Sequence, residues 1–138
     1  MTNIRNHVTR ELVSVEGSAT CREAARLMAE RTIGSVAVRE GGRVVGLATE
    51  RDLMVAVVAA GGDGTLPVKR AMRALPVVSP AATEGECATL MRDQSTRHLL
   101  VEEAGAVVGV VSMRDIIQLM LDEKQYVIDQ LKEYIGRG

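Results

Sequence analysis

A short phrase occurs twice in this chain: VVGLATERD at residues 44–52 and VVGVVSMRD at residues 107–115. The match extends beyond the phrase, because residues 13–54 align with residues 76–117 without a gap. Most aligned positions that are not identical are apolar in both copies. A repeat of this length predicts two related units packed about a pseudo-twofold axis, and it places any site in one unit twice in the molecule.

Each copy begins with the same local signals. A short β-branched strand is expected at residues 13–15 and again at residues 77–78. The sequence Thr-x-x-Glu follows at residues 20–23 and 83–86. This spacing is that of a capping box, in which the hydroxyl and the carboxylate bond free amides at a helix start. A helix is therefore expected directly after each short strand.

Two apolar strands and a second helix complete each copy. In the first copy the strands are expected at residues 35–39 and 44–48, with the turn at residues 40–43 between them. The second copy repeats this hairpin, and the second helices begin at Thr49 and at Ser112. The unit is therefore read as β-α-β-β-α, and the fold class as α/β.

The domain boundaries follow from the repeat. The first unit is expected at residues 4–62 and the second at residues 68–120, each beginning with a short helical segment. Residues 121–138 form a charged C-terminal tail with amphipathic helical periodicity. Four apolar side chains of the tail share one helical face: Val127, Leu131, Tyr134 and Ile135.

Composition excludes several classes of function. The net charge of −1 gives no electrostatic reason to expect nucleic acid or an anionic membrane as a partner. The chain has no Phe, no Trp and two Tyr, which argues against RNA modules that stack bases on aromatic rings. The longest apolar run, residues 53–60, is too short to span a bilayer, and the N-terminus lacks a secretory signal. A cytoplasmic location is expected.

No catalytic or metal-binding set appears in the sequence. Cys21 and Cys87 are not at equivalent repeat positions, and no Cys/His cluster with zinc spacing is present, so both are read as reduced structural thiols. No P-loop, dinucleotide-binding glycine fingerprint or nucleophile–base–acid set is found. The chain is therefore predicted not to be an enzyme and to require no cofactor or metal.

The repeated β-α-β-β-α unit and the doubled phrase resemble the CBS-domain pair, also called a Bateman module. The resemblance covers the chain from about Ile4 to Met120. It implies a regulatory module that binds an adenosine-containing nucleotide (AMP, ADP or ATP) in clefts between the two repeats. Binding would shift the orientation of the units, or of two chains, and so change the state of a regulated partner protein.

The resemblance assigns roles to the polar residues of the doubled phrase. Asp52 and Asp115 would accept hydrogen bonds from the ribose hydroxyls, with Thr49 and Ser112 helping at the helix N-terminus. The same pairs are also explained by helix capping alone, which is worth about 0.5–2 kcal/mol.

Phosphate and adenine contacts are implied at other positions. The resemblance assigns phosphate contacts to basic residues around the second hairpin: Arg97 and His98, with Arg51 and Arg114 beside the aspartates. The counterparts of Arg97 and His98 in the first copy, Gly34 and Ser35, carry no charge, so two unequal clefts are expected. Adenine would contact main-chain groups at the strand starts and before the first helices: Thr9, Val13, Ile33, Gly34, Ser35, Arg73, Val77 and Thr96. Solvent exposure for the basic residues and core packing for the apolar ones are the alternative readings.

Three rival functions remain open at this point. The chain is alternatively a structural dimerisation module with vestigial clefts, a small enzyme, or a sensor of another ligand such as S-adenosylmethionine, NAD or a metal. A homodimer is expected, with the second helices in the interface and the tail reinforcing it, since the apolar stripe is too large to leave in water. The alternative is a tail folded back on its own module.

Overall fold

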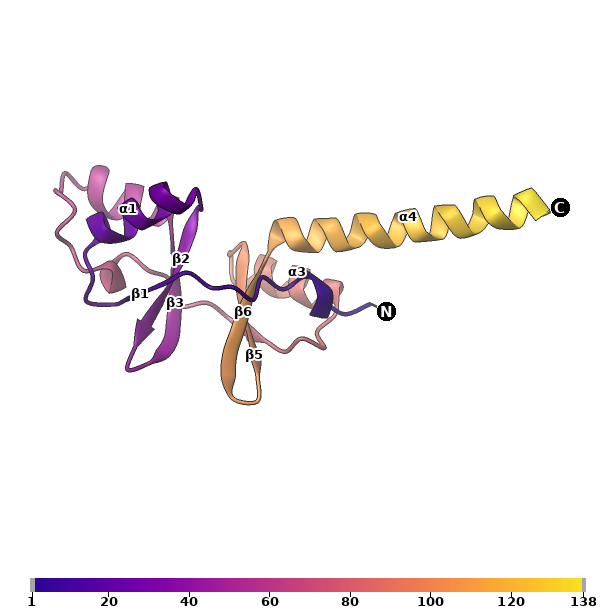
Figure 1. The fold of residues 1–138 in the computed structure, drawn as a ribbon, viewed down its shortest axis with the longest axis horizontal. Helices are drawn as coiled ribbons and strands as arrows, with labels where there is room; N and C mark the ends of the chain where they lie inside the picture. Colours follow the sequence, from indigo (N-terminus) through magenta and orange to yellow (C-terminus); the bar gives the residue numbers. More distant parts are fainter. Residues whose placement is uncertain (1, 138) are drawn as a thin grey trace. The chain divides into compact units, whose positions relative to one another are not determined.

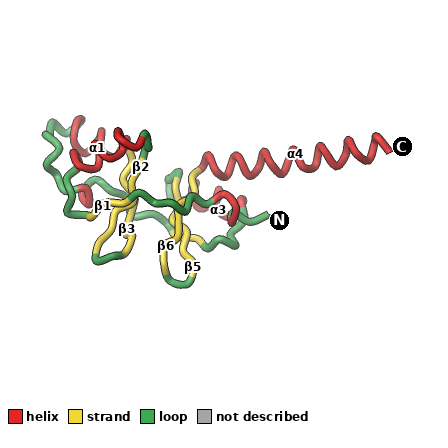
Figure 2. The backbone as a smooth tube through the Cα atoms, in the orientation of Figure 1, coloured by secondary structure: helices red, strands yellow, loops and turns green. Residues whose placement is uncertain are grey.

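The computed structural model describes residues 2–137, which pack as two compact units. We call them the Asp52 unit, residues 10–75 with 104–107, and the Asp115 unit, residues 2–9, 76–103 and 108–137. Each unit contains one three-stranded sheet and its own helices (Figures 1 and 2). The mixed α/β fold and the tandem repeat predicted from the sequence are confirmed.

The Asp52 unit contains β1 (Ser14–Glu16), α1 (Cys21–Arg31), β2 (Ser35–Glu40), β3 (Arg43–Thr49) and α2 (Glu50–Leu53). In its sheet β1 pairs parallel with β2, and β2 pairs antiparallel with β3. Gly41 and Gly42 make the turn with φ of 57° and 78°. Positive φ at both central residues is what a two-residue hairpin of this twist requires, so glycine is suited to both positions.

The Asp115 unit repeats this order with β4 (Val77–Val78), α3 (Glu84–Asp93), β5 (His98–Glu103), β6 (Ala106–Ser112) and α4 (Met113–Arg137). Its sheet has the order β4-β5-β6, with β4 parallel to β5. Both expected capping boxes are present, at the start of α1 and at the start of α3. In α1, for example, the Glu23 amide donates to Thr20 Oγ1 at 3.0 Å, and the Thr20 amide donates to Glu23 Oε2 at 2.9 Å.

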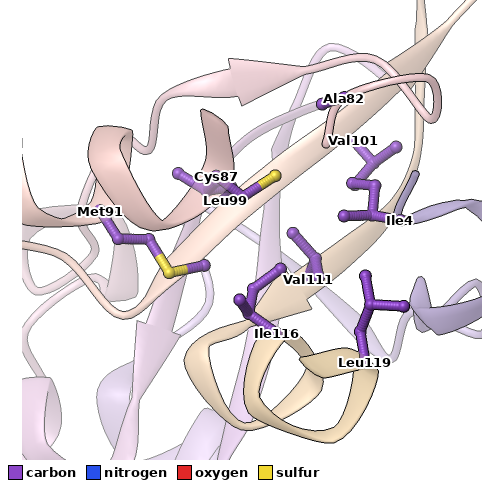
Figure 3. Close-up of a cluster of buried hydrophobic side chains, with 9 residues drawn as sticks. All are labelled: Ile4, Ala82, Cys87, Met91, Leu99, Val101, Val111, Ile116 and Leu119. Carbon is purple, nitrogen blue, oxygen red and sulfur yellow. The ribbon is translucent and has the colours of Figure 1, made fainter. Parts of the chain in front are cut away.

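Each unit has its own apolar core between its sheet and its helices. In the Asp52 unit Ala24 and Met28 of α1 pack with Val36, Val38 and Ala48 of the hairpin. Figure 3 shows the corresponding core of the Asp115 unit, whose members are Ile4, Ala82, Cys87, Met91, Leu99, Val101, Val111, Ile116 and Leu119. Both cysteines are free and buried, one in each core, in agreement with their reading as structural thiols.

The short helical segments that precede the repeats pack with the opposite copy. Residues 2–9, which include the 3-10 turn η1 (Arg5–His7), belong to the Asp115 unit, and residues 68–75, which include η3 (Val68–Arg70), belong to the Asp52 unit. Ile4 is fully buried in the core of Figure 3, and Val68 is fully buried in the other core. Each packed unit therefore combines one repeat with the segment that precedes the other repeat in the chain.

The second helices of the two units differ. In the Asp52 unit α2 is short and continues as a π-helical stretch, η2 (Met54–Val58), before the chain turns at Gly61 with φ 76°. In the Asp115 unit α4 runs without interruption to Arg137. The sequence suggested a repeat helix followed by a separate tail helix. The two are one helix because no Gly or Pro lies between Met113 and Ile135 to interrupt it.

Candidate functional site

In each unit the hairpin ends where the second helix begins, and a capping box forms at this junction. In the Asp52 unit the Thr49 amide donates to Asp52 Oδ2 at 2.9 Å, and the Asp52 amide donates to Thr49 Oγ1 at 3.1 Å. In the Asp115 unit the Ser112 amide donates to Asp115 Oδ2 at 2.7 Å, and the Asp115 amide donates to Ser112 Oγ at 3.1 Å. Both acids therefore cap their helices, as the capping interpretation predicts.

Capping uses only one oxygen of each carboxylate. The Ser112 hydroxyl also donates to Asp115 Oδ2, at 2.9 Å, and Oδ1 of Asp115 makes no hydrogen bond or ion pair with any residue in the range 2–137. Oδ1 of Asp52 lies 4.0 Å from Nε of Arg73. Each carboxylate thus keeps an acceptor oxygen for another donor. Helix capping and ligand binding, which appear as alternatives in the sequence, are compatible in the structure.

The residue that starts each hairpin contacts the same helix start through its main chain. The Gly34 carbonyl accepts the Glu50 amide at 2.9 Å, and the Arg97 carbonyl accepts the Met113 amide at 2.8 Å. These equivalent bonds hold the strand start beside the capping acid. Arg97 itself is exposed, whereas Thr96 is buried, with its hydroxyl donating to the His98 carbonyl at 3.2 Å.

The preceding segments cross the return strands at equivalent positions. Thr9 and Val110 exchange two backbone hydrogen bonds, of 2.9 and 3.0 Å, and Arg73 exchanges two with Leu47, of 2.9 and 3.0 Å. The pairing of Thr9 with Arg73 as equivalent positions, suggested by the sequence, agrees with these two bridges.

Two glycines make this crossing fit, and sequence reasoning assigned them no role. A Cβ on Gly46 would lie 2.5 Å from the Arg73 carbonyl oxygen, and a Cβ on Gly109 would lie 2.5 Å from the Thr9 carbonyl oxygen. Real Cβ atoms do not approach carbonyl oxygens so closely. The signal was present in the doubled phrase, since a glycine inside a strand often marks close approach of another backbone segment.

The structure divides the predicted site residues between the two units. Thr9 and Val13, grouped in the sequence as positions before the first helix, lie in different units, and so do Arg73 and Val77. With Asp52 lie Val13, Ile33, Gly34, Ser35, Thr49, Arg51 and Arg73. With Asp115 lie Thr9, Val77, Thr96, Arg97, His98, Ser112 and Arg114. The reason is the crossing just described, which sends each preceding segment to the other copy.

This exchange changes the distribution of charge between the two candidate sites. The sequence indicated that the first copy lacks a basic residue at the strand start, where Gly34 replaces Arg97. In the structure Arg73 brings a guanidinium to the Asp52 unit, and its counterpart in the other unit is the uncharged Thr9. The Arg73 side chain is 58% exposed, whereas that of Asp52 is only 14% exposed. Each unit therefore has one additional arginine, supplied from a different segment.

An apolar pocket lies in the Asp52 unit, and its lining includes the predicted site residues Ile33 and Gly34 but not Asp52. Its volume is about 730 Å³, and α1, α2 and η2 line it with side chains that include Ala25, Met28, Leu53, Met54 and Val57. Met54, Val55 and Val58 of this region are exposed. Such an apolar helical surface is typical of a packing face rather than of a polar ligand site.

Two structural features are absent from residues 2–137. No helix in this part of the chain has the length and apolar character needed to cross a membrane. No three His, Cys, Asp or Glu side chains within it gather as a metal ion would require.

Comparison with known proteins identifies the family. The family model "CBS domain" matches residues 4–59 and 68–122. The CBS domain-containing protein YhcV of Bacillus subtilis is 29% identical over 117 residues, which cover 84% of each chain. The chain therefore belongs to the CBS-domain family and carries two CBS domains in tandem.

Solved structures agree in fold with this assignment. An uncharacterized conserved protein from Pyrococcus horikoshii superposes with a TM-score of 0.77 at 31% identity, over 86% of this chain and 92% of that chain. The CBS domain protein PAE2072 from Pyrobaculum aerophilum, solved in complex with AMP, gives a TM-score of 0.71 at 30% identity, over 83% and 89%. A pair of CBS domains is a regulatory ligand-binding module.

Proposed function

We propose that this chain senses an adenine nucleotide, AMP, ADP or ATP, through its two capping aspartates. The observation that carries the proposal is that the helix cap fixes Oδ2 of each acid and leaves Oδ1 unused, with Oδ1 of Asp52 4.0 Å from Nε of Arg73. A carboxylate oxygen is a strong acceptor for the neighbouring hydroxyls of a ribose, and a charged hydrogen bond of this kind is worth about 1.5–3 kcal/mol.

The surroundings of each acid suit the rest of a nucleotide. The exposed arginines at the two sites, Arg73 beside Asp52 and Arg97 in the Asp115 unit, have the charge and the donor geometry that phosphate needs. The strand starts at Ile33 and Thr96 and the preceding residues Val13 and Val77 offer main-chain groups for adenine. The AMP complex of PAE2072 supports this choice of ligand class.

Regulation follows from differential binding. A nucleotide that binds one conformational state of the pair more tightly than another shifts the population toward that state, by no more than the difference in affinity. We propose that a partner protein responds to this shift, and that the chain itself performs no catalytic step. A homodimer is the proposed assembly, because apolar side chains of η2 and α4 are exposed on the isolated chain.

The test compares two kinds of capping acid: those for which a ribose contact is proposed and those for which none is proposed. Asp52→Asn and Asp115→Asn each keep an oxygen that accepts the capping amide but remove the carboxylate. Glu23→Gln and Glu86→Gln make the same chemical change in the capping boxes of α1 and α3, where no ligand is proposed. We expect each aspartate change to weaken AMP binding at its own site by about tenfold or more, and the glutamate changes to have no effect on affinity.

The measurement is calorimetric titration, preceded by a thermal-shift panel of AMP, ADP, ATP, S-adenosylmethionine and NAD. A ligand at 100 times its dissociation constant adds about 2.7 kcal/mol to the free energy of unfolding, which the panel resolves. The double variant with Asn at residues 52 and 115 should lose binding and keep its fold. Unchanged AMP affinity in that double variant contradicts the proposal. A thermal shift with S-adenosylmethionine or NAD alone would mean that this compound, and not AMP, ADP or ATP, is the ligand.

A further inference from the structure

The C-terminal part of α4 presents an apolar stripe that the rest of its unit does not cover. Ile116 and Leu119 are the buried residues of this helix, and Glu123 is half-buried. Beyond Glu123 the helix continues past α3 (Figure 1). The side chains of Val127, Leu131, Tyr134 and Ile135 are 55%, 56%, 79% and 73% exposed. The expectation of a tail that reaches back to its own module therefore does not fit this unit.

The stripe has the spacing of a helix–helix seam. Residues of the seam recur in repeating steps of three, one and three, which correspond to positions a, d and e of a heptad: Lys124, Val127, Ile128, Leu131, Tyr134 and Ile135, preceded by Leu121 at e. Half-buried Ile128 lies at the centre of the series Leu121, Ile128 and Ile135. A second helix laid along this seam would bury the apolar stripe.

From this pattern we propose that α4 pairs with α4 of a second copy of this chain in antiparallel orientation, centred near Ile128. In this register Leu131 packs against Val127 of the second copy, and Leu121 packs against Ile135 of the second copy. The centre of the seam, Ile128, meets its own symmetry mate. Residues 121–137 of each chain are then paired along about 25 Å.

The polar residue in the seam selects the antiparallel direction. A parallel pair would place Lys124 directly against Lys124 of the second copy, so that two like charges would be buried together. The antiparallel register instead places Lys124 against Tyr134 of the second copy. An ammonium group over a phenol ring is attracted to the ring face, and the alkyl part of Lys124 covers apolar surface.

Charges at the margin of the seam agree with the same register. Glu123 and Arg137 both occupy position g, and the antiparallel register brings Glu123 of one chain to Arg137 of the other, twice by symmetry. Glu123 lies next to Glu84 of α3, and burial together with this neighbouring carboxyl group raises the pKa of Glu84. Arg137 of the second copy would therefore arrive at a cluster of two acidic groups. Within its own chain Arg137 contacts Glu133.

The first experiment measures the assembly of the full chain. Sedimentation equilibrium should give a dimer at tens of micromolar. Leu131→Asp should raise the dissociation constant of the dimer at least tenfold and leave the circular dichroism spectrum of the protein unchanged. Glu123→Arg and Arg137→Glu should each weaken the dimer, and the two changes combined should restore it. A monomeric wild type, or a dimer unaffected by Leu131→Asp, overturns the proposal.

The second experiment determines whether the two α4 helices pair in antiparallel or parallel orientation. A mixture of Leu121→Cys and Ile135→Cys chains under mild oxidation should yield the mixed disulfide, and each variant alone should remain largely uncrosslinked. Cys21 and Cys87 are buried and do not compete. Disulfides within each single variant, without the mixed species, would show a parallel pair and overturn the proposal. AMP affinity, measured on the same chains, reports separately on the nucleotide site.

Discussion

Thr9 pairs with Val110 through two backbone hydrogen bonds, although the two residues lie near opposite ends of the chain. The bond joins the segment before the first repeat to the return strand of the second repeat. Val110 is two residues before Ser112, which begins the capping box of Asp115, so the bridge brings Thr9 close to that box. The equivalent bridge of Arg73 to Leu47 brings an arginine to Asp52. The crossing therefore determines which side chains surround each capping acid.

The crossing predicts that replacing either of two glycines with alanine lowers stability. Gly109→Ala and Gly46→Ala each place a Cβ 2.5 Å from a carbonyl oxygen, of Thr9 or of Arg73, so the segment must move away. We expect each change to lower the free energy of unfolding by about 1–3 kcal/mol, the usual cost of overpacking. Urea denaturation followed by circular dichroism measures the loss.

The matched control is Gly85→Ala, because Gly85 lies in α3 with no atom within 4 Å of the added Cβ. This change should leave stability equal or slightly raised, since alanine favours a helix over glycine. Equal stability of the Gly109→Ala chain and the wild type would contradict the close approach.

The cap of α3 predicts that two threonine variants of this helix differ in stability. Thr83→Ala removes the hydroxyl that accepts the Glu86 amide at 3.2 Å, and we expect a loss of about 1 kcal/mol in the free energy of unfolding. Thr89→Ala changes an exposed threonine inside the same helix and should have little effect or stabilise slightly. Thermal unfolding of the two variants in parallel makes the comparison. A loss of stability as large for Thr89→Ala as for Thr83→Ala would show that capping is not the cause.

The buried thiol in the core of Figure 3 predicts a loss of stability at high pH. Burial, with a smaller contribution from the charge of Glu86, raises the pKa of the Cys87 thiol from 9.0 to about 11. The folded state therefore favours the neutral thiol more strongly than the unfolded state does. Its contribution to stability is complete below pH 9 and is lost as the pH rises through 11.

We expect the free energy of unfolding to fall between pH 9 and pH 11, and to fall less steeply in Cys87→Ala. The quantity compared is the slope with pH, so that the constant cost of the smaller side chain cancels. The thiol of the native chain should also react slowly with iodoacetamide at pH 8 and rapidly in urea. Identical slopes in the two chains would assign the pH dependence to other groups.

The two arginines from different segments predict how phosphate is recognised. Arg97→Ala and Arg73→Ala should each weaken AMP binding about tenfold at the site of its own unit and change adenosine binding less than twofold, because only AMP carries the phosphate. Arg92→Ala, an exposed arginine on α3, is the control. Titration calorimetry with both ligands makes the comparison. An equal loss of affinity for AMP and for adenosine would show that these arginines do not bind the phosphate.

Most of the local structure was predictable because its causes act over a few residues. The capping boxes at Thr20 and Thr83 need only a hydroxyl and an acid three positions apart, and the glycine turn at residues 41–42 needs only two residues with positive φ. The repeat itself then doubles each signal. The acids Asp52 and Asp115 were found as candidates in the same way, since their pattern is local.

What surrounds these acids was not predictable from local signals. Thr9 and Val13 are close in sequence, yet they belong to different units, because a strand is completed by whichever segment reaches its free backbone groups. The length of α4 was also misjudged, since periodicity continues through its whole span and only the exposure of each face shows where the core ends.

The sequence by itself determined the two CBS units, their order of helices and strands, and the capping acid at the start of each second helix. These features rest on hydrogen-bond and side-chain patterns that repeat within a few residues. Only the tertiary structure decided that Arg73 lies beside Asp52 and Thr9 beside Val110, and that the caps leave Oδ1 of each acid unused. These features depend on contacts between distant segments, where the space at Gly46 and Gly109 and the direction of the crossing chain select the neighbours.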